Sequence, residues 1–113
     1  MKVVSLVSQK GGVGKTTLAT ALAVAAHRDG KQVFLVDLDP QASASFWMDT
    51  REDDGLAITA IPASRLGHVL SAANGAGADI AIIDTPPFAK DIAFAAAQHA
   101  DLVLIPPGRL SSM

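Results

Sequence analysis

Residues 9–17 read QKGGVGKTT, and they join a short apolar run, residues 2–7, to an alanine-rich helical pattern, residues 15–28. Glycines let a backbone turn tightly and approach a ligand without a Cβ clash. Successive N–H groups in such a turn, with the positive end of the following helix, attract phosphate oxygens. The strand–loop–helix context predicts a phosphate-binding loop, or P-loop, for a nucleoside triphosphate. The competing interpretation is a Gly-rich turn that binds no ligand.

Within this loop the sequence predicts a role for each position. The Lys15 ammonium is expected to reach the β- and γ-phosphates, and the Thr16 hydroxyl is expected to ligate magnesium. The other positions expected to bind the nucleotide are Gly11, Gly12, Val13, Gly14 and Thr17. The predicted ligands are therefore ATP and Mg²⁺.

Outward from the loop, apolar runs alternate with helical patterns. We expect strands at residues 2–7, 33–38, 56–61, 80–84 and 102–105, helices at 15–28, 64–72 and 89–98, and a turn at 74–77. In the first helix the expected buried face is Leu18, Ala21, Leu22 and Ala25, with Gly30 just past the end. Near-continuous apolar strands separated by helices predict an α/β P-loop NTPase fold with a mostly parallel sheet and helices on both faces.

Acidic residues end two of the expected strands. Asp37 and Asp39 end the second strand, and Asp84 ends the fourth. Ligands of parallel sheets bind beyond the carboxyl ends of the strands. Asp37 and Asp39 would face the same side of an extended strand, and they would repel unless a cation lies there. An apolar strand that ends in a carboxylate, as at Asp84, is typical of a magnesium site reached through water. The alternative for either residue of the second strand is a turn or helix cap before Pro40.

Three segments together resemble the deviant Walker A ATPases of the ParA type: KGGVGKTT at residues 10–17, DLDPQ at 37–41 and DTPP at 84–87. The resemblance covers residues 1–105, and it implies ATP hydrolysis in plasmid or chromosome partitioning, with an ATP-dependent homodimer and a ParB-like activator. Lys10 matches the lysine that reaches the other subunit's phosphates; the alternative is that Lys10 binds phosphate in its own subunit. Asp39 matches the residue that positions the attacking water, and Asp37 and Asp84 match residues near the magnesium ion.

Composition limits the other possibilities. The chain has 113 residues and a formal net charge of −2, which predicts a single domain, residues 1–113, without the basic cluster that nucleic acid attracts. There are no cysteines, so thiolate metal sites and cysteine-held iron–sulfur clusters are excluded. The apolar run at residues 3–7 is too short for a signal or a membrane span, so the expected location is cytoplasmic. A MinD-like membrane ATPase would need a C-terminal amphipathic helix, and the sequence shows none.

The last eight residues read PPGRLSSM, where the resemblance implies further strands and helices. We therefore expect an incomplete P-loop domain with apolar surface exposed near the last strand, self-association without ATP, and no retardation of duplex DNA. Three alternatives stay open: a truncated fragment without catalysis, a deviant Walker A ATPase with different cargo, and a metabolic synthetase of the same superfamily. The histidines, His27, His68 and His99, are too dispersed to form a ligand set.

Overall fold

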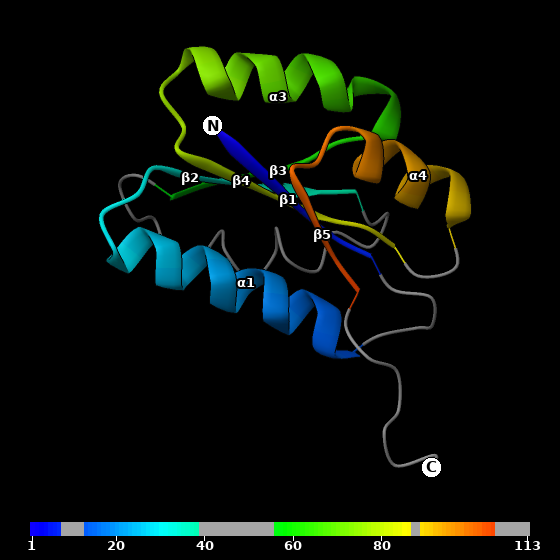
Figure 1. Ribbon diagram of the computed structural model, residues 1–113, viewed down its shortest axis with the longest axis horizontal. Coiled ribbons are helices and arrows are strands. Elements are labelled where there is room, and N and C mark those ends of the chain that lie inside the picture. The colour runs from blue at the N-terminus through cyan, green and yellow to red at the C-terminus, as the bar shows by residue number, and fades with distance from the viewer. Residues whose placement is uncertain (8–12, 39–55, 87–88, 106–113) are drawn as a thin grey trace.

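The computed structural model describes residues 1–7, 13–38, 56–86 and 89–105 (Figure 1). These residues form a parallel sheet of five strands in the order β3-β2-β4-β1-β5. The strands are β1 (Lys2–Leu6), β2 (Val33–Asp37), β3 (Leu56–Ala60), β4 (Ile80–Asp84) and β5 (Leu102–Leu104). The helices are α1 (Val13–Arg28), α3 (Leu66–Gly75) and α4 (Lys90–Gln98), and a short 3₁₀ helix, η1 (Ala63–Arg65), leads into α3.

The sheet has a hydrophobic core on each face, because successive side chains of a strand point to opposite sides. The core between α1 and the sheet contains Leu6, Ala19, Ala23, Val33, Leu35 and Ile82. The core under α3 and α4 contains Val3, Val36, Leu38, Leu66, Leu70, Ala81, Ile83 and Ala96. Figure 1 shows α1 on one side of the sheet and α3 with α4 on the other. The predicted α/β fold, with a parallel sheet covered on both faces, is confirmed.

The buried face of α1 differs in part from the predicted one. The residues of α1 that pack against the sheet are Leu18, Ala19, Leu22, Ala23 and Ala26. Ala21 and Ala25 are exposed, so the prediction was wrong for these two alanines. Apolar residues occupy nearly every position from 18 to 26, which leaves little contrast between faces from which to read the orientation of the helix.

The end of α1 follows the prediction. Gly30 has a φ of 85°, in the left-handed region that favours glycine. The Lys31 N–H donates to the Ala26 carbonyl at 3.1 Å, and the Gly30 N–H donates to the His27 carbonyl at 3.0 Å. These two bonds form a Schellman motif, which ends the helix and turns the chain back toward β2.

The boundaries of the other elements agree with the predicted ones to within one residue, except around α3. The helix runs to Gly75, so the predicted turn at residues 74–77 begins too early. The predicted helix at 64–72 also begins inside η1 and ends before α3 does. Its actual end is set by Gly77, whose φ is 93°.

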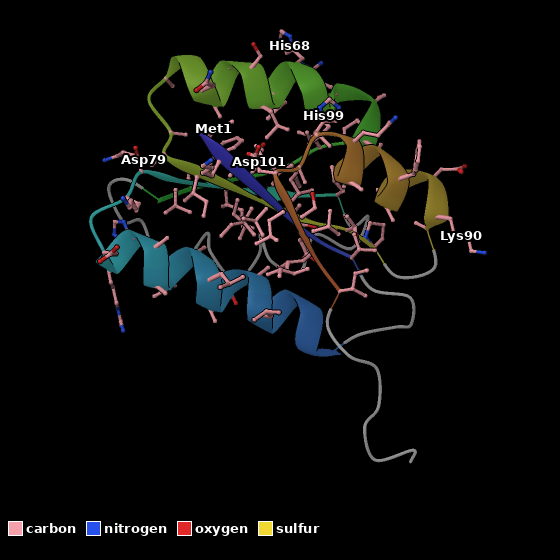
Figure 2. The ribbon with its side chains drawn as sticks, viewed as in Figure 1. Met1, His68, Asp79, Lys90, His99 and Asp101 are labelled. Carbon is pink, nitrogen blue, oxygen red and sulfur yellow. The ribbon has the colours of Figure 1, made fainter. Side chains whose placement is uncertain are left out.

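Two aspartates form hydrogen bonds between neighbouring strands at the amino ends of the sheet. The Asp79 carboxylate accepts the Gln32 N–H at 2.7 Å, and the Asp79 N–H donates to the Gln32 carbonyl at 2.8 Å. Asp101 makes the same pair of bonds with Val3, at 2.8 Å to the carboxylate and 2.7 Å to the carbonyl. Figure 2 shows Asp79 and Asp101 where β4 and β5 begin. Each pair of bonds sets the alignment of a strand with its neighbour from the first residue.

Large apolar side chains remain exposed around β5. Phe94 of α4 is 66% exposed, Leu102 of β5 is 52% exposed and Ile105 is 59% exposed. The expected exposure of apolar surface near the last strand is confirmed. Self-association through that surface stays a prediction.

Candidate functional site

The carboxyl ends of three neighbouring strands lie together at one edge of the sheet. Asp84, the last residue of β4, pairs with Leu6 of β1 on one side and with Asp37 of β2 on the other. The chain leaves β1 at this edge, and α1 begins at Val13 before it runs back across β2 and β4 (Figure 1). The edge therefore combines two carboxylates with the amino end of a helix.

Both carboxylates are buried on the face that α1 covers. Asp37 is 1% exposed and Asp84 is 0% exposed. Leu35 and Ile82, two residues earlier in each strand, lie in the core under α1, and strand side chains repeat their direction every second residue. Because adjacent strands are about 4.8 Å apart, Asp37 and Asp84 place two like charges side by side in the protein interior.

This pair fits a magnesium ion that arrives with a nucleotide. Magnesium prefers oxygen ligands, and it is usually held by one or two carboxylates together with substrate phosphates. Among residues 1–7, 13–38, 56–86 and 89–105, no group of three or more His, Asp or Glu side chains is placed to hold a metal.

The structure describes some of the predicted site residues and not others. It brings Asp37 and Asp84 together, as neighbours in register. Residues 13–17, which include Lys15 and Thr16, form the first turns of α1, so the helix begins two residues before the predicted start. Lys10, Gly11, Gly12 and Asp39 lie outside the described residues. The chemical roles assigned to all these residues stay predictions.

Thr85 is a residue of this edge that the sequence analysis did not single out. Its side chain is fully buried, and its Oγ1 donates to the Leu6 carbonyl at 2.8 Å. Its N–H donates to the same carbonyl at 3.3 Å, and the Leu38 N–H donates to the Asp84 carbonyl at 2.9 Å. The chain after β4 is thus bonded to the ends of β1 and β2. The available signal was a hydroxyl residue between a buried strand and the proline pair of DTPP.

A family model described as the CobQ/CobB/MinD/ParA nucleotide binding domain matches residues 4–83. That range includes the whole glycine-rich loop, α1 and the Asp37 strand, and it ends beside Asp84. The chain belongs to the CobQ/CobB/MinD/ParA family.

Relatives of this CobQ/CobB/MinD/ParA domain include partitioning proteins. The maintenance of carboxysome distribution protein A of Gloeobacter kilaueensis is 39% identical over 106 residues, which are 93% of this chain and 48% of that protein. The chromosome-partitioning ATPase Soj of Thermus thermophilus is 51% identical over 53 residues, which are 47% of this chain and 21% of Soj. The predicted resemblance to ParA-type proteins is confirmed. The chain spans about half the length of the first of these relatives, 48%.

Among solved structures, cobyrinic acid a,c-diamide synthase from Mycobacterium smegmatis with bound ATP analog and magnesium is similar to this chain. The TM-score is 0.75 at 23% identity, over 95% of this chain and 60% of that one. At this identity the likeness shows the shared fold. Among the helices that the structure describes, none has the length and apolar character needed to cross a membrane.

Proposed function

We propose that the chain binds ATP with magnesium at the carboxyl edge of its sheet, as a single nucleotide-binding domain, and serves ATP hydrolysis in a ParA-type partitioning cycle. The observation that carries the proposal is the pair of buried aspartates, Asp37 and Asp84, in register beside the amino end of α1. Membership of a nucleotide-binding family supports the ligand. The relatives named for chromosome partitioning and carboxysome distribution support cargo positioning.

The charges at this edge favour a ligand that brings both phosphate groups and magnesium. The amino end of α1 attracts the anionic triphosphate, because the first N–H groups of a helix point outward and carry partial positive charge. The two carboxylates repel the same anion. Magnesium coordinated by phosphate oxygens reverses that repulsion, so the affinity for nucleotide depends strongly on the metal.

The proposed roles follow from these positions. Asp37, Asp84 and the Thr16 hydroxyl hold the metal, and Lys15 binds the β- and γ-phosphates. The main chain of residues 11–17 wraps the phosphates. Asp39 orients the water that attacks the γ-phosphate, and Lys10 neutralises the charge that develops on it. When bound, magnesium supplies charge neutralisation at the phosphate oxygens.

We also infer an ATP-dependent homodimer with a ParB-like activator in the cytoplasm, on the basis of the ParA-type resemblance. Lys10 is then the residue that joins the two subunits through the partner's phosphates. Light scattering with and without ATP tests this inference, since Lys10→Ala should still bind nucleotide but lose the ATP-dependent dimer. A Lys10→Ala variant that dimerises as the parent does would assign Lys10 to the phosphates of its own subunit.

Calorimetric titration with magnesium-ATP tests the proposed site. Lys15→Ala should weaken binding roughly 10- to 100-fold, because it removes a charged hydrogen bond to phosphate. Lys31→Ala is the matched control, since Lys31 is an exposed lysine just past the other end of α1. It should bind as the parent does. Equal affinity of Lys15→Ala and the parent would show that the phosphates bind elsewhere.

A further inference from the structure

The Leu6 carbonyl links the end of β1 to the residue that follows Asp84. Leu6 is the last residue of β1, from which the chain enters the glycine-rich segment. It is also the register partner of Asp84. Its carbonyl accepts both the Oγ1 hydroxyl and the N–H of Thr85, at 2.8 Å and 3.3 Å. One oxygen atom thus connects the start of the loop to the residue after Asp84.

The Thr85 side chain is suited to hold this connection rigidly. It is fully buried and β-branched, so its χ1 angle is restricted. The hydroxyl adds a second and shorter hydrogen bond, 2.8 Å, to the 3.3 Å bond that the main-chain N–H makes to the same carbonyl. The neighbouring Leu38 N–H, bonded to the Asp84 carbonyl at 2.9 Å, fixes the other side of the same strand end. The Asp84 main chain is therefore held between β1 and β2.

We propose that Thr85 is a positioning residue whose buried hydroxyl keeps the Asp84 carboxylate in place relative to the phosphate-binding loop. The inference rests on the proposed function, in which Asp84 holds magnesium and the loop holds the phosphates. Loss of the hydroxyl loosens the placement of Asp84 relative to the loop. It removes no group that binds the metal or the phosphates. The effect falls on the gain in nucleotide affinity that magnesium provides, and much less on the metal-free affinity.

A second buried hydroxyl in the same part of the fold serves as a matched control. Ser5 of β1 is fully buried, and its Oγ donates to the Ala96 carbonyl of α4 at 2.9 Å. Ser5 lies next to Leu6, but its side chain points to the opposite face, toward α4. Ser5→Ala therefore removes an equivalent buried hydrogen bond without touching the link between Leu6 and Thr85.

The first experiment measures the affinity for a non-hydrolysable ATP analogue by calorimetry, with magnesium and with a chelator. Thr85→Val keeps the shape and removes the hydroxyl, and it should reduce the magnesium-dependent gain about fivefold, the effect of one hydrogen bond. Thr85→Ser, which retains the hydroxyl, should restore most of the gain. Ser5→Ala should lower the melting temperature and leave the gain unchanged. An unchanged gain in Thr85→Val, or an equal loss in Ser5→Ala, would overturn the proposal.

The second experiment needs no nucleotide. NMR amide exchange in Thr85→Val should be faster than in the parent at position 85 and at Val7, whose N–H donates to the Leu104 carbonyl at 2.9 Å. The Val3 amide, bonded to Asp101 at the other end of β1, should stay protected. Unchanged exchange at both Val7 and position 85 would refute the positioning role itself. A parent chain that does not bind the analogue would instead refute the proposed function, so the two failures are distinguishable.

Discussion

The two ends of the sheet use aspartate in opposite ways. At the amino ends of β4 and β5, Asp79 and Asp101 are exposed, and each carboxylate accepts a main-chain N–H of the neighbouring strand. At the carboxyl ends of β2 and β4, Asp37 and Asp84 are buried beside one another under α1. The first pair remains in water and fastens the strands. The second pair brings two like charges together in the interior.

This difference separates a structural use of the residue from a functional one. A carboxylate that accepts a hydrogen bond at the surface stabilises the fold at little cost in desolvation. Two adjacent buried carboxylates cost free energy through desolvation and mutual repulsion. In the proposed site a bound magnesium-nucleotide offsets this repulsion, so substitutions at the carboxyl ends should act on ligand affinity and those at the amino ends on stability.

The largest expected effect is at the carboxyl end. Asp84→Asn keeps the shape of the side chain and removes its charge, so it should lower magnesium-dependent nucleotide affinity by about tenfold or more. The metal-free affinity should change much less, and the melting temperature shows whether the variant remains folded. Calorimetry with and without magnesium and a thermal melt would measure both. If Asp84→Asn keeps the parent's magnesium dependence, the two ends do not differ in the proposed way.

A smaller effect is expected at Asp101, and on stability alone. Asp101→Ala leaves the partly buried Val3 N–H without its carboxylate acceptor, which should lower the free energy of unfolding by about 1–3 kcal/mol. Urea denaturation measures this loss. Asp101→Asn retains an acceptor oxygen and should lose much less. A change in the magnesium dependence of Asp101→Ala would mean that the amino end also contributes to the site.

The smallest effect is expected at Asp79. Its bond to the Gln32 N–H is exposed to solvent, so water replaces the carboxylate when it is removed. Asp79→Ala should therefore lower the free energy of unfolding by only about 0.5–1 kcal/mol, measured in the same urea series. A loss as large as that of Asp101→Ala would show that solvent exposure does not set the strength of these bonds.

Much of the fold follows from local sequence, because the apolar runs at 33–36 and 80–83 are continuous and the glycine at position 30 ends a helical pattern. The orientation of α1 does not follow, since its alanines provide little contrast between faces. The pairing of Asp37 with Asp84 also lies beyond local patterns. It depends on β2 and β4 being neighbours, and strand order is a property of the assembled sheet.

The candidate site was predicted in its residue types and only partly in its geometry. The spacing around Lys15, Thr16 and Asp84 indicated a nucleotide site because loop glycines and strand-end carboxylates have few other common uses together. The contribution of Thr85 could not be predicted in this way. A threonine after a strand carries no special signal until the neighbouring strand supplies the Leu6 carbonyl as an acceptor.

The most direct test of the account locates the metal. Mn²⁺ replaces Mg²⁺ in a complex with ADP, and its unpaired electrons broaden the NMR signals of nearby amides in steep dependence on distance. Asp79 and Thr85, which flank β4, lie about 20 Å apart along the extended chain. The account predicts that the amides of Leu38 and Thr85 broaden far more than those of Asp79 and Asp101. Stronger broadening at Asp79 and Asp101 would contradict a magnesium-nucleotide site at the carboxyl edge of the sheet. Broadening that is the same with and without ADP would also contradict it.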